Sequence, residues 1–304
     1  MYAYQEKNTL FQSLRTEVAL LYVAILVFLA LFFSHPLFLL ALLLALNVVI
    51  FSAGIMREWL VYLKFTLLLT ALIILVNTLF VQEGATVLLR SPRLPLIGTV
   101  RITWEALCFG VGMGLRLVVM TGAFCLLTYA VHPDRILQTL GGGNSKILLT
   151  LSISIRLLPL AAADFTRITE AQRCRGVNFQ VRGLDAKIRK YIPVFNTVLL
   201  SSLERSFQLA ESLQSRGYGA GRRTFLRESL WRIRDYLVLA ALLLAVVYAV
   251  LLFFTGWGVY SYYPRLQPVT GEEMILAAGL ALFFLFPAIL NWGWVRWRFL
   301  RLKI

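Results

Sequence analysis

Blocks of about 20 mostly apolar residues recur along this chain, and they constrain its fold more than any other feature. An α-helix needs a stretch of about that length to cross the hydrocarbon core of a bilayer. The composition agrees, because 59% of the residues are hydrophobic and only 15% are charged, against about 25% charged in soluble domains. We predict an all-α polytopic membrane protein with about six transmembrane helices. The blocks lie at 18–33, 37–53, 60–81, 106–131, 236–254 and 275–294.

The basic residues are distributed unequally between the segments that join these blocks. If the N-terminus is cytoplasmic, the outer side receives only Arg90, Arg93, Arg101 and Arg265. This asymmetry is the positive-inside bias of membrane proteins. It predicts a multi-pass protein with both termini in the cytoplasm, and it explains the net charge of +15 without nucleic-acid binding. The inner side receives Lys7, Arg15, Arg57, Lys64, the segment 132–234, and a tail with Arg296, Arg298, Arg301 and Lys303.

The outer segment 82–104 contains two short runs that are typical of strands. Thr86–Leu89 and Thr99–Thr103 are rich in β-branched and apolar residues, and the residues between them include Pro92, Pro95 and Gly98. Proline and glycine between two such runs indicate a turn. We therefore predict a small β-hairpin in this segment.

Arg116 lies inside the fourth apolar block, after glycines at 110, 112 and 114. An intramembrane arginine can mark a transport path. It can also lie near the inner end of its helix or pack against a neighbouring one. The glycines favour the structural interpretation, because small residues let helices approach closely. Their spacing is not that of a nucleotide-binding loop, since no strand precedes them.

Residues 132–234 differ from the rest of the chain in their charge. They contain seventeen Lys or Arg against seven Asp or Glu, a net charge of +10. Within them, the apolar stretch 147–160 includes Arg156 and Pro159, so we predict an interfacial helix that Pro159 ends or kinks. Three parts are predicted: an N-terminal transmembrane bundle (1–131), a basic cytoplasmic domain of amphipathic helices (132–234), and C-terminal spans with a basic tail (235–304).

Two helices are predicted after this stretch, and their sequences are alike. Glu170–Gly176 aligns with Glu211–Gly217 at a constant offset of 41, and both segments end in Arg-Gly. A single Arg-Gly is an ordinary helix end, since glycine and basic residues are both favoured there. Two of them favour a function, because an exposed arginine suits a carboxylate-lined groove. The second helix also has an apolar face with helical spacing, formed by Leu199, Leu203, Phe207, Ala210 and Leu213.

These residues resemble a known family, the transmembrane component of energy-coupling factor transporters. In that family two cytoplasmic coupling helices end in a short Ala-Arg-Gly-like motif. Cys174-Arg175-Gly176 and Ser215-Arg216-Gly217 match it in Arg and Gly and have another small residue in place of Ala. The resemblance covers about residues 15–235 and is most specific at 155–218. Similar context is found at Tyr191–Pro193, where the second helix is expected to begin, and at Ile155–Pro159, Leu94–Gly98, Ile102–Thr103 and Gly114–Arg116.

The resemblance implies a non-catalytic subunit of an ATP-driven importer in a prokaryotic cell membrane. Its partners would be two ABC-type ATP-binding subunits and a small hydrophobic membrane subunit that binds the substrate, a vitamin or a transition-metal ion. The six motif residues would dock the ATPases, and the apolar face of the second helix would transmit their motion. ATP would be bound by the partners and no cofactor by this chain, which has no Gly-x-x-x-x-Gly-Lys-Ser/Thr sequence.

Two other classes of function remain as alternatives. A membrane enzyme acting on a lipid-type substrate would need clustered acidic residues for Mg²⁺, but those of the basic segment are scattered. A self-contained secondary transporter would need several intramembrane ionisable residues, and Arg116 alone does not supply them. The three cysteines lack metal-ligand spacing and the two histidines each precede a proline, so no catalytic and no metal-binding residues are predicted.

Overall fold

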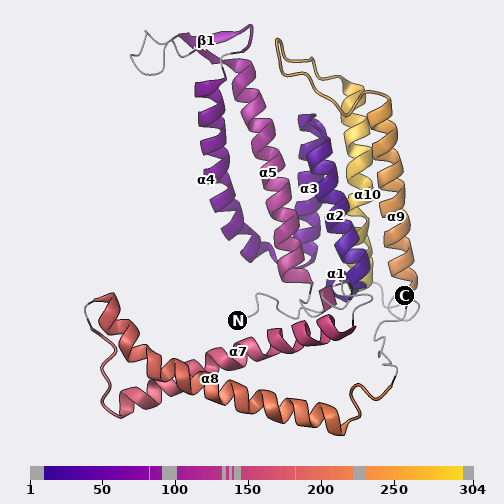
Figure 1. Ribbon diagram of the computed structural model, residues 1–304. Helices are drawn as coiled ribbons and strands as arrows, with labels where there is room; N and C mark the ends of the chain where they lie inside the picture. The colour runs from indigo at the N-terminus through magenta and orange to yellow at the C-terminus, as the bar shows by residue number, and fades with distance from the viewer. Residues whose placement is uncertain are drawn as a thin grey trace. The chain divides into compact units, whose positions relative to one another are not determined.

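A computed structural model of the chain describes residues 10–81, 83–90, 101–131, 135–136, 139, 145–181, 183–221 and 231–296. The chain divides into two compact units (Figure 1). We call residues 2–139 with 229–304 the transmembrane unit, and residues 140–228 the helix-pair unit. The helix-pair unit lies within the basic segment 132–234.

The transmembrane unit confirms the predicted all-α polytopic architecture. Within the described residues, α4, α5, α9 and α10 are long and apolar enough to cross a membrane, whereas α2 and α3 have 17 residues each. These six helices correspond to the six apolar blocks. The helices of this unit are α1 Leu10–Ser13, α2 Thr16–Phe32, α3 Pro36–Ser52, α4 Met56–Phe80, α5 Trp104–Ala130, α9 Ile233–Phe254 and α10 Gly271–Arg296.

Local sequence explains where several of these helices begin. Pro36 occupies the first turn of α3, where its missing N–H is not needed, and the Nδ1 atom of His35 accepts a hydrogen bond from the Leu37 N–H at 3.2 Å. Thr103 plays the same capping role for α5, since its hydroxyl oxygen accepts from the Ala106 N–H. Both residues satisfy donors that the first helical turn leaves open.

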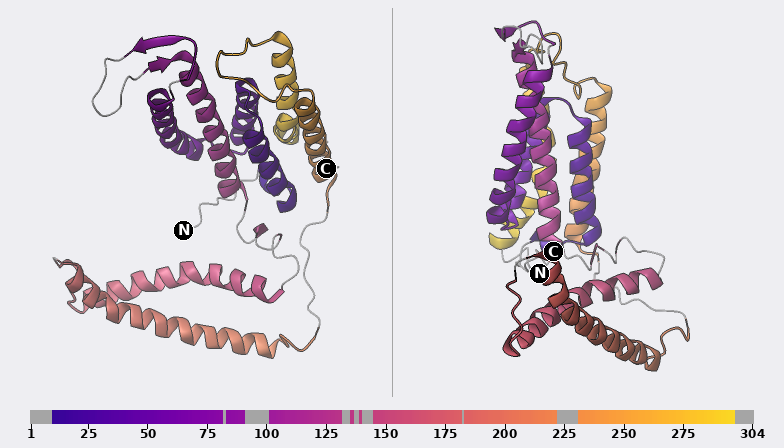
Figure 2. Two further views of the ribbon diagram at one scale, coloured as in Figure 1. Left: turned by 45° about the horizontal axis from the view of Figure 1, so that its top comes forward. Right: turned by 60° about the vertical axis from the view of Figure 1, so that its left-hand side comes forward.

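The glycines of α5 allow the close helix packing that the sequence predicts. A Cβ atom on Gly110 would lie 3.1 Å from the Cα atom of Ile74 in α4, and one on Gly114 would collide with Thr70. Gly122 faces α3 and α4 instead, where a Cβ atom would lie 2.7 Å from Leu46. Because these glycines have no side chain, α4 and α5 can approach closely, and the two helices pack along most of their length, as the views of Figure 2 show.

The two C-terminal helices are joined to the N-terminal ones by hydrogen bonds between residues far apart in sequence. The Tyr22 hydroxyl of α2 donates to the carbonyl oxygen of Phe284 in α10 at 3.1 Å. The Asn291 side chain donates to the carbonyl oxygen of Ser52 at the end of α3, at 2.7 Å. Helices α9 and α10 are therefore part of one bundle with α2 and α3.

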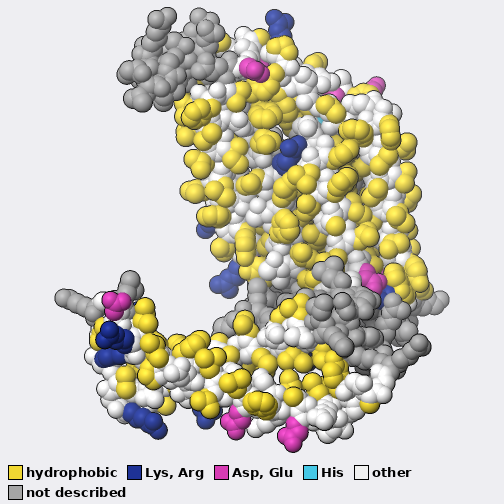
Figure 3. All heavy atoms as spheres, viewed as in Figure 1, with side chains coloured by type: hydrophobic (Ala, Val, Ile, Leu, Met, Phe, Trp, Pro, Cys, Tyr) yellow, Lys and Arg dark blue, Asp and Glu magenta, His cyan; other side chains and the backbone are white. Residues whose placement is uncertain are grey.

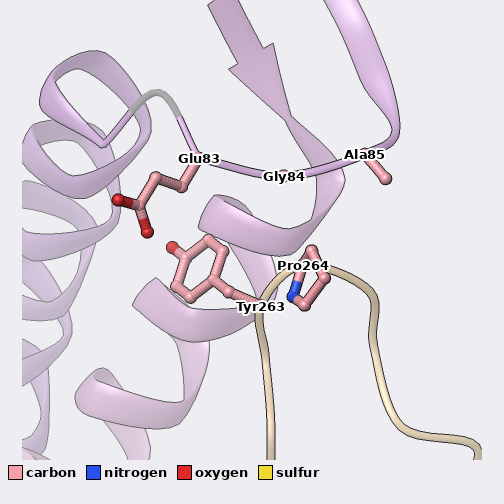
Figure 4. A pocket seen from close by; sticks show the side chains of 5 residues that line it. All are labelled: Glu83, Gly84, Ala85, Tyr263 and Pro264. Atoms are coloured by element: carbon pink, nitrogen blue, oxygen red, sulfur yellow. The ribbon is translucent and has the colours of Figure 1, made fainter.

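The predicted β-hairpin is confirmed. Strands β1 (Val87–Arg90) and β2 (Arg101–Thr103) are antiparallel, with Arg90 opposite Arg101. The base of the hairpin contacts the loop between α9 and α10, because the Ala85 N–H donates to the carbonyl oxygen of Pro264 at 3.1 Å. Figure 4 shows the open pocket at this contact, with the Tyr263 ring between Glu83 and Pro264.

The helix-pair unit consists of α7 (Ser145–Cys174) and α8 (Leu184–Ser215), which pack against each other and cross (Figures 1 and 2). Of the two predictions for Pro159, that it ends the helix is wrong, because α7 continues through it; that it kinks the helix stays a prediction. The second predicted helix begins earlier than expected, so that Pro193 lies inside α8 rather than at its start. Residues 149–174 of α7 also have the length and composition of a span, but their mean hydropathy of 1.3 is lower than the 1.8–3.0 of α4, α5, α9 and α10.

Some sequence predictions fall outside the described residues. They concern the hairpin turn with Pro92, Pro95 and Gly98, residues 222–230 of the basic segment, and the tail residues Arg298, Arg301 and Lys303.

Candidate functional site

The two Arg-Gly ends have the same backbone structure. At the end of α7, the N–H groups of Gly176 and Val177 donate to the carbonyl oxygens of Arg173 and Gln172 at 2.9 and 3.1 Å. At the end of α8, the N–H groups of Gly217 and Tyr218 donate to Gln214 and Leu213 at 2.9 and 3.0 Å. This pair of bonds is the Schellman closure, which satisfies carbonyl groups that the last helical turn leaves open.

The glycines of both ends have backbone conformations that favour glycine. Gly176 has φ of +88° and Gly217 has φ of +74°, and a Cβ atom on either would meet nothing within 4 Å. The requirement is therefore conformational and not one of space. Gly54 after α3 and Gly256 after α9 have the same closure with positive φ. There the glycine follows Ala53 and Thr255, so the closure does not need an arginine.

The two arginines are exposed and make no side-chain interaction with the described residues. Arg175 and Arg216 both lie on the surface of the helix-pair unit, and their guanidinium groups have no hydrogen bond or ion pair within the described part of the chain. Of their small neighbours, Cys174 is exposed and the Ser215 hydroxyl donates to the carbonyl oxygen of Ser212 at 2.9 Å. Each end thus presents a free positively charged fork able to bind two carboxylate oxygens.

The two ends lie at opposite ends of the crossed helix pair (Figure 1). Contacts between α7 and α8 hold this arrangement. Arg205 of α8 forms an ion pair with Asp164 of α7 at 2.8 Å, and the Tyr191 ring stacks on Phe165 with centroids 5.8 Å apart. Because Tyr191 also contacts Phe179 after α7, the α7–α8 connection is packed against α8.

The predicted apolar face of α8 is largely exposed. Leu199, Leu203 and Phe207 have exposed fractions of 46%, 57% and 73%, Ala210 is exposed and Leu213 is half-buried. Figure 3 shows hydrophobic side chains along the helix-pair unit. An amphipathic helix normally buries its apolar face. A continuous exposed apolar stripe is therefore typical of a contact with another protein or a membrane.

Sequence reasoning missed the first half of this stripe. Ile188, Ile192 and Phe195 continue it toward the start of α8, and all three are exposed. Their spacing of three and four residues would have revealed them. They were missed because Pro193 suggested a helix beginning there.

Arg116 has the structural role that its sequence context favours. It lies near the middle of α5, and its Nη2 atom donates to the carbonyl oxygen of Phe33, the residue after α2, at 3.0 Å. Arg116 thus packs against the end of a neighbouring helix and does not lie near the inner end of its own. Within the described residues, no group of three or more His, Cys, Asp or Glu could hold a metal ion.

Comparison with known proteins gives consistent results. Residues 7–226 match the family described as cobalt transport protein (CbiQ). The energy-coupling factor transporter transmembrane protein EcfT of Exiguobacterium sibiricum is 30% identical over 57% of this chain and 69% of its own length. The protein of the same name from Streptococcus thermophilus is 35% identical over 56% of this chain and 68% of its own. That from Streptococcus equi is 32% identical over 60% and 69%.

Proposed function

The chain belongs to the CbiQ family of cobalt transport proteins and is the transmembrane component of an energy-coupling factor transporter, and we propose that it couples two ABC-type ATPase subunits to a substrate-binding membrane subunit. It is a transporter subunit and not an enzyme. ATP is bound and hydrolysed by the two partners, and this chain needs no cofactor of its own.

The free arginines at the two Arg-Gly ends carry the proposal. The Schellman closures explain Gly176 and Gly217, but nothing within the described residues explains Arg175 and Arg216. A solvated arginine without a partner gains little from its position, whereas one that enters a carboxylate-lined groove forms strong paired hydrogen bonds. Each motif, Cys174–Gly176 and Ser215–Gly217, docks one ATPase subunit.

The crossed arrangement of α7 and α8 supports two docking sites and not one. The two Arg-Gly ends belong to different helices at opposite ends of the pair, so one subunit cannot occupy both at once. When the ATPases close on ATP, they move the two ends relative to each other. The Asp164–Arg205 ion pair and the Phe165–Tyr191 stack lie where the helices meet and keep the pair together during this motion.

The exposed apolar stripe of α8 transmits the motion. Leu199, Leu203 and Phe207, with Ala210 and Leu213, contact the small hydrophobic membrane subunit that binds the substrate, a vitamin or a transition-metal ion. Residues 132–234 and both termini are cytoplasmic, and the chain lies in the cell membrane of a prokaryote. The excess of basic residues in 132–234 supports this orientation.

Alanine substitutions at the two arginines test this function. An arginine that only favours its helix end through the dipole contributes about 0.3–1 kcal/mol, whereas truncation of one paired with an interface carboxylate costs about 2–5 kcal/mol. We expect Arg175→Ala and Arg216→Ala to reduce recovery of the chain on a tagged ATPase subunit and to reduce uptake. Arg189→Ala is the matched control, because Arg189 is exposed on α8 away from the motif.

The level of membrane-inserted chain must be measured in parallel, since both effects require a folded protein. Arg175→Glu and Arg216→Glu should be worse than the alanine variants, because they place a negative charge against the groove carboxylates. Normal assembly and uptake in the alanine variants would show that the two motifs only end their helices and do not dock the ATPases.

A further inference from the structure

The positive charge of Arg116 is not neutralised within the described part of the transmembrane unit. Its Nη2 atom donates to the carbonyl oxygen of Phe33, and the nearby Tyr262 hydroxyl donates to that of Ser34, both at 3.0 Å. These bonds satisfy carbonyl groups at the end of α2. No described carboxylate forms an ion pair with Arg116, and its Nε atom is buried without a hydrogen-bond partner among the described atoms.

The other edge of the guanidinium lies beside exposed apolar side chains. The Nη1 atom is 3.6 Å from the Sδ atom of Met113, and the Met113 side chain is 37% exposed. Phe32, which precedes Phe33 in the chain, has an exposed fraction of 44%. A charge among such side chains is costly inside a bilayer unless water or a counter-charge reaches it.

The lengths of the helices bring the polar region of the membrane toward Arg116. At 1.5 Å per residue, the 17 residues of α2 and of α3 span about 26 Å, which is less than the hydrocarbon core of about 30 Å. A short span thins the bilayer around it and draws flanking polar groups inward. Because Arg116 is hydrogen-bonded to the residue that follows α2, it lies at the level of the α2–α3 turn.

We propose that Arg116 binds the phosphate group of a phospholipid at the α2–α3 turn, on the outer side of the membrane in the proposed topology. The guanidinium holds the turn through Nη2 and presents the remaining N–H groups of Nη1 and Nη2 to the phosphate, which accepts such paired bonds well. The acyl chains lie along Phe32 and Met113. The bound lipid supplies the counter-charge that the described chain lacks, and this inference does not depend on the transport role.

Lipid retention by the purified chain tests the proposal. Native mass spectrometry in detergent, with phosphatidylglycerol titrated in, measures the affinity of the tightest lipid. We expect Arg116→Gln to bind it about tenfold more weakly, the change expected for loss of one hydrogen bond to a charged group. Arg265→Gln is the matched control, since Arg265 is exposed in the loop on the same side. Excess inorganic phosphate should not displace the lipid, because it has no acyl chains; displacement would assign the site to a free anion and overturn the proposal.

A second variant guards against misfolding. Arg116→Lys keeps the charge and one donor for Phe33 but loses the fork, so we expect an intermediate affinity; if Arg116→Gln does not fold, Arg116→Lys alone decides. Equal lipid affinity in the parent and in a folded Arg116 variant overturns the proposal. A variant that keeps its lipid but loses a co-purifying membrane subunit also overturns it, and assigns Arg116 to a protein carboxylate.

Discussion

At the scale of single residues, the Arg-Gly ends separate two roles that lie side by side in the sequence. The glycines were predictable, because few residue types other than glycine accept the positive φ of a helix stop. Ala53-Gly54 and Thr255-Gly256 close their helices in the same way without arginine. The structure therefore shows that Arg175 and Arg216 are not needed for the closure, which the sequence alone could not decide.

Gly217→Ala and Gly176→Ala should each destabilise the end of its helix by about 1–2 kcal/mol, the cost of a left-handed conformation for a residue with a Cβ atom. Amide hydrogen exchange of the full chain in detergent measures the effect, as faster exchange at Gly217 and Tyr218 or at Gly176 and Val177. Gly221→Ala is the control, because Gly221 also has open space around it but no positive φ. Equal exchange in all three variants would contradict the strain.

His35 should make the stability of the transmembrane unit depend on pH. Burial lowers the pKa of His35 from 6.5, and Glu273, whose Oε2 atom lies 3.4 Å from Nε2, opposes this shift. The folded chain thus keeps a neutral imidazole, whose Nδ1 atom caps α3. The contribution of His35 to the free energy of unfolding is fully present above about pH 6.5. It is lost as the pH falls toward the lower folded pKa, because only the unfolded chain takes up the proton in this range.

Unfolding midpoints in detergent at pH 7.5 and 5.5 measure this dependence. His35→Asn should reduce it and remain folded, because asparagine is also a good helix cap. His132→Asn, at the other histidine of the chain, serves as the control. An unchanged pH dependence in His35→Asn would show that another group causes it.

At the scale of elements, the apolar blocks predicted the spans well, and the prolines misled the prediction of α7 and α8. An internal proline removes one helical hydrogen bond and crowds the preceding turn. Packing outweighs this cost at Pro193, because the adjacent Val194 is fully buried and Val198 is nearly so. Such contacts between helices are not visible in the local sequence, which explains why the α8 stripe was predicted only from Leu199 onward.

Asp235 joins the starts of α2 and α9. It is buried, and its two carboxylate oxygens accept the N–H groups of Arg15 at 3.3 Å and of Arg232 at 3.1 Å. We expect Asp235→Ala to lower the free energy of unfolding in detergent by about 2–3 kcal/mol, since it removes hydrogen bonds to a charged group. Asp185→Ala is the control, because Asp185 is also in a first helical turn but is exposed. Equal losses of unfolding free energy in the two variants would show that Asp235 does not stabilise the contact between the starts of α2 and α9.

At the scale of the whole molecule, the family match ends at residue 226, before α9 and α10. These helices are nevertheless bonded to the matched part, through Tyr22 with Phe284 and Asn291 with Ser52. The apolar blocks predicted both helices, but not their partners, because the bonded residues are up to 262 positions apart. The number of membrane-spanning helices is therefore easier to predict from the sequence than which helices pack against each other.

The topology of the whole chain depends on α7, whose residues 149–174 have the length and composition of a span. If α7 crossed the membrane, residues 177–190 would be outside, together with the basic residues Arg182, Lys187, Arg189 and Lys190. That placement opposes the positive-inside bias. We therefore expect α7 to remain on the cytoplasmic side, with residues 82–104 and 257–273 outside.

Cysteine labelling of intact cells decides between the two topologies. In a chain whose three native cysteines are replaced by Ala or Ser, a membrane-impermeant maleimide should modify Ser261→Cys and spare Gln180→Cys, at positions that are both exposed in the folded chain. After permeabilisation both should react, which shows that Gln180→Cys is protected by the membrane and not by burial. Because α8 lacks the composition of a span, reaction of Gln180→Cys in intact cells would place the whole of α8 outside. The Arg216 end would then lie outside the cell, where it could not contact a cytoplasmic ATPase. This result would contradict both the topology and the proposed coupling role.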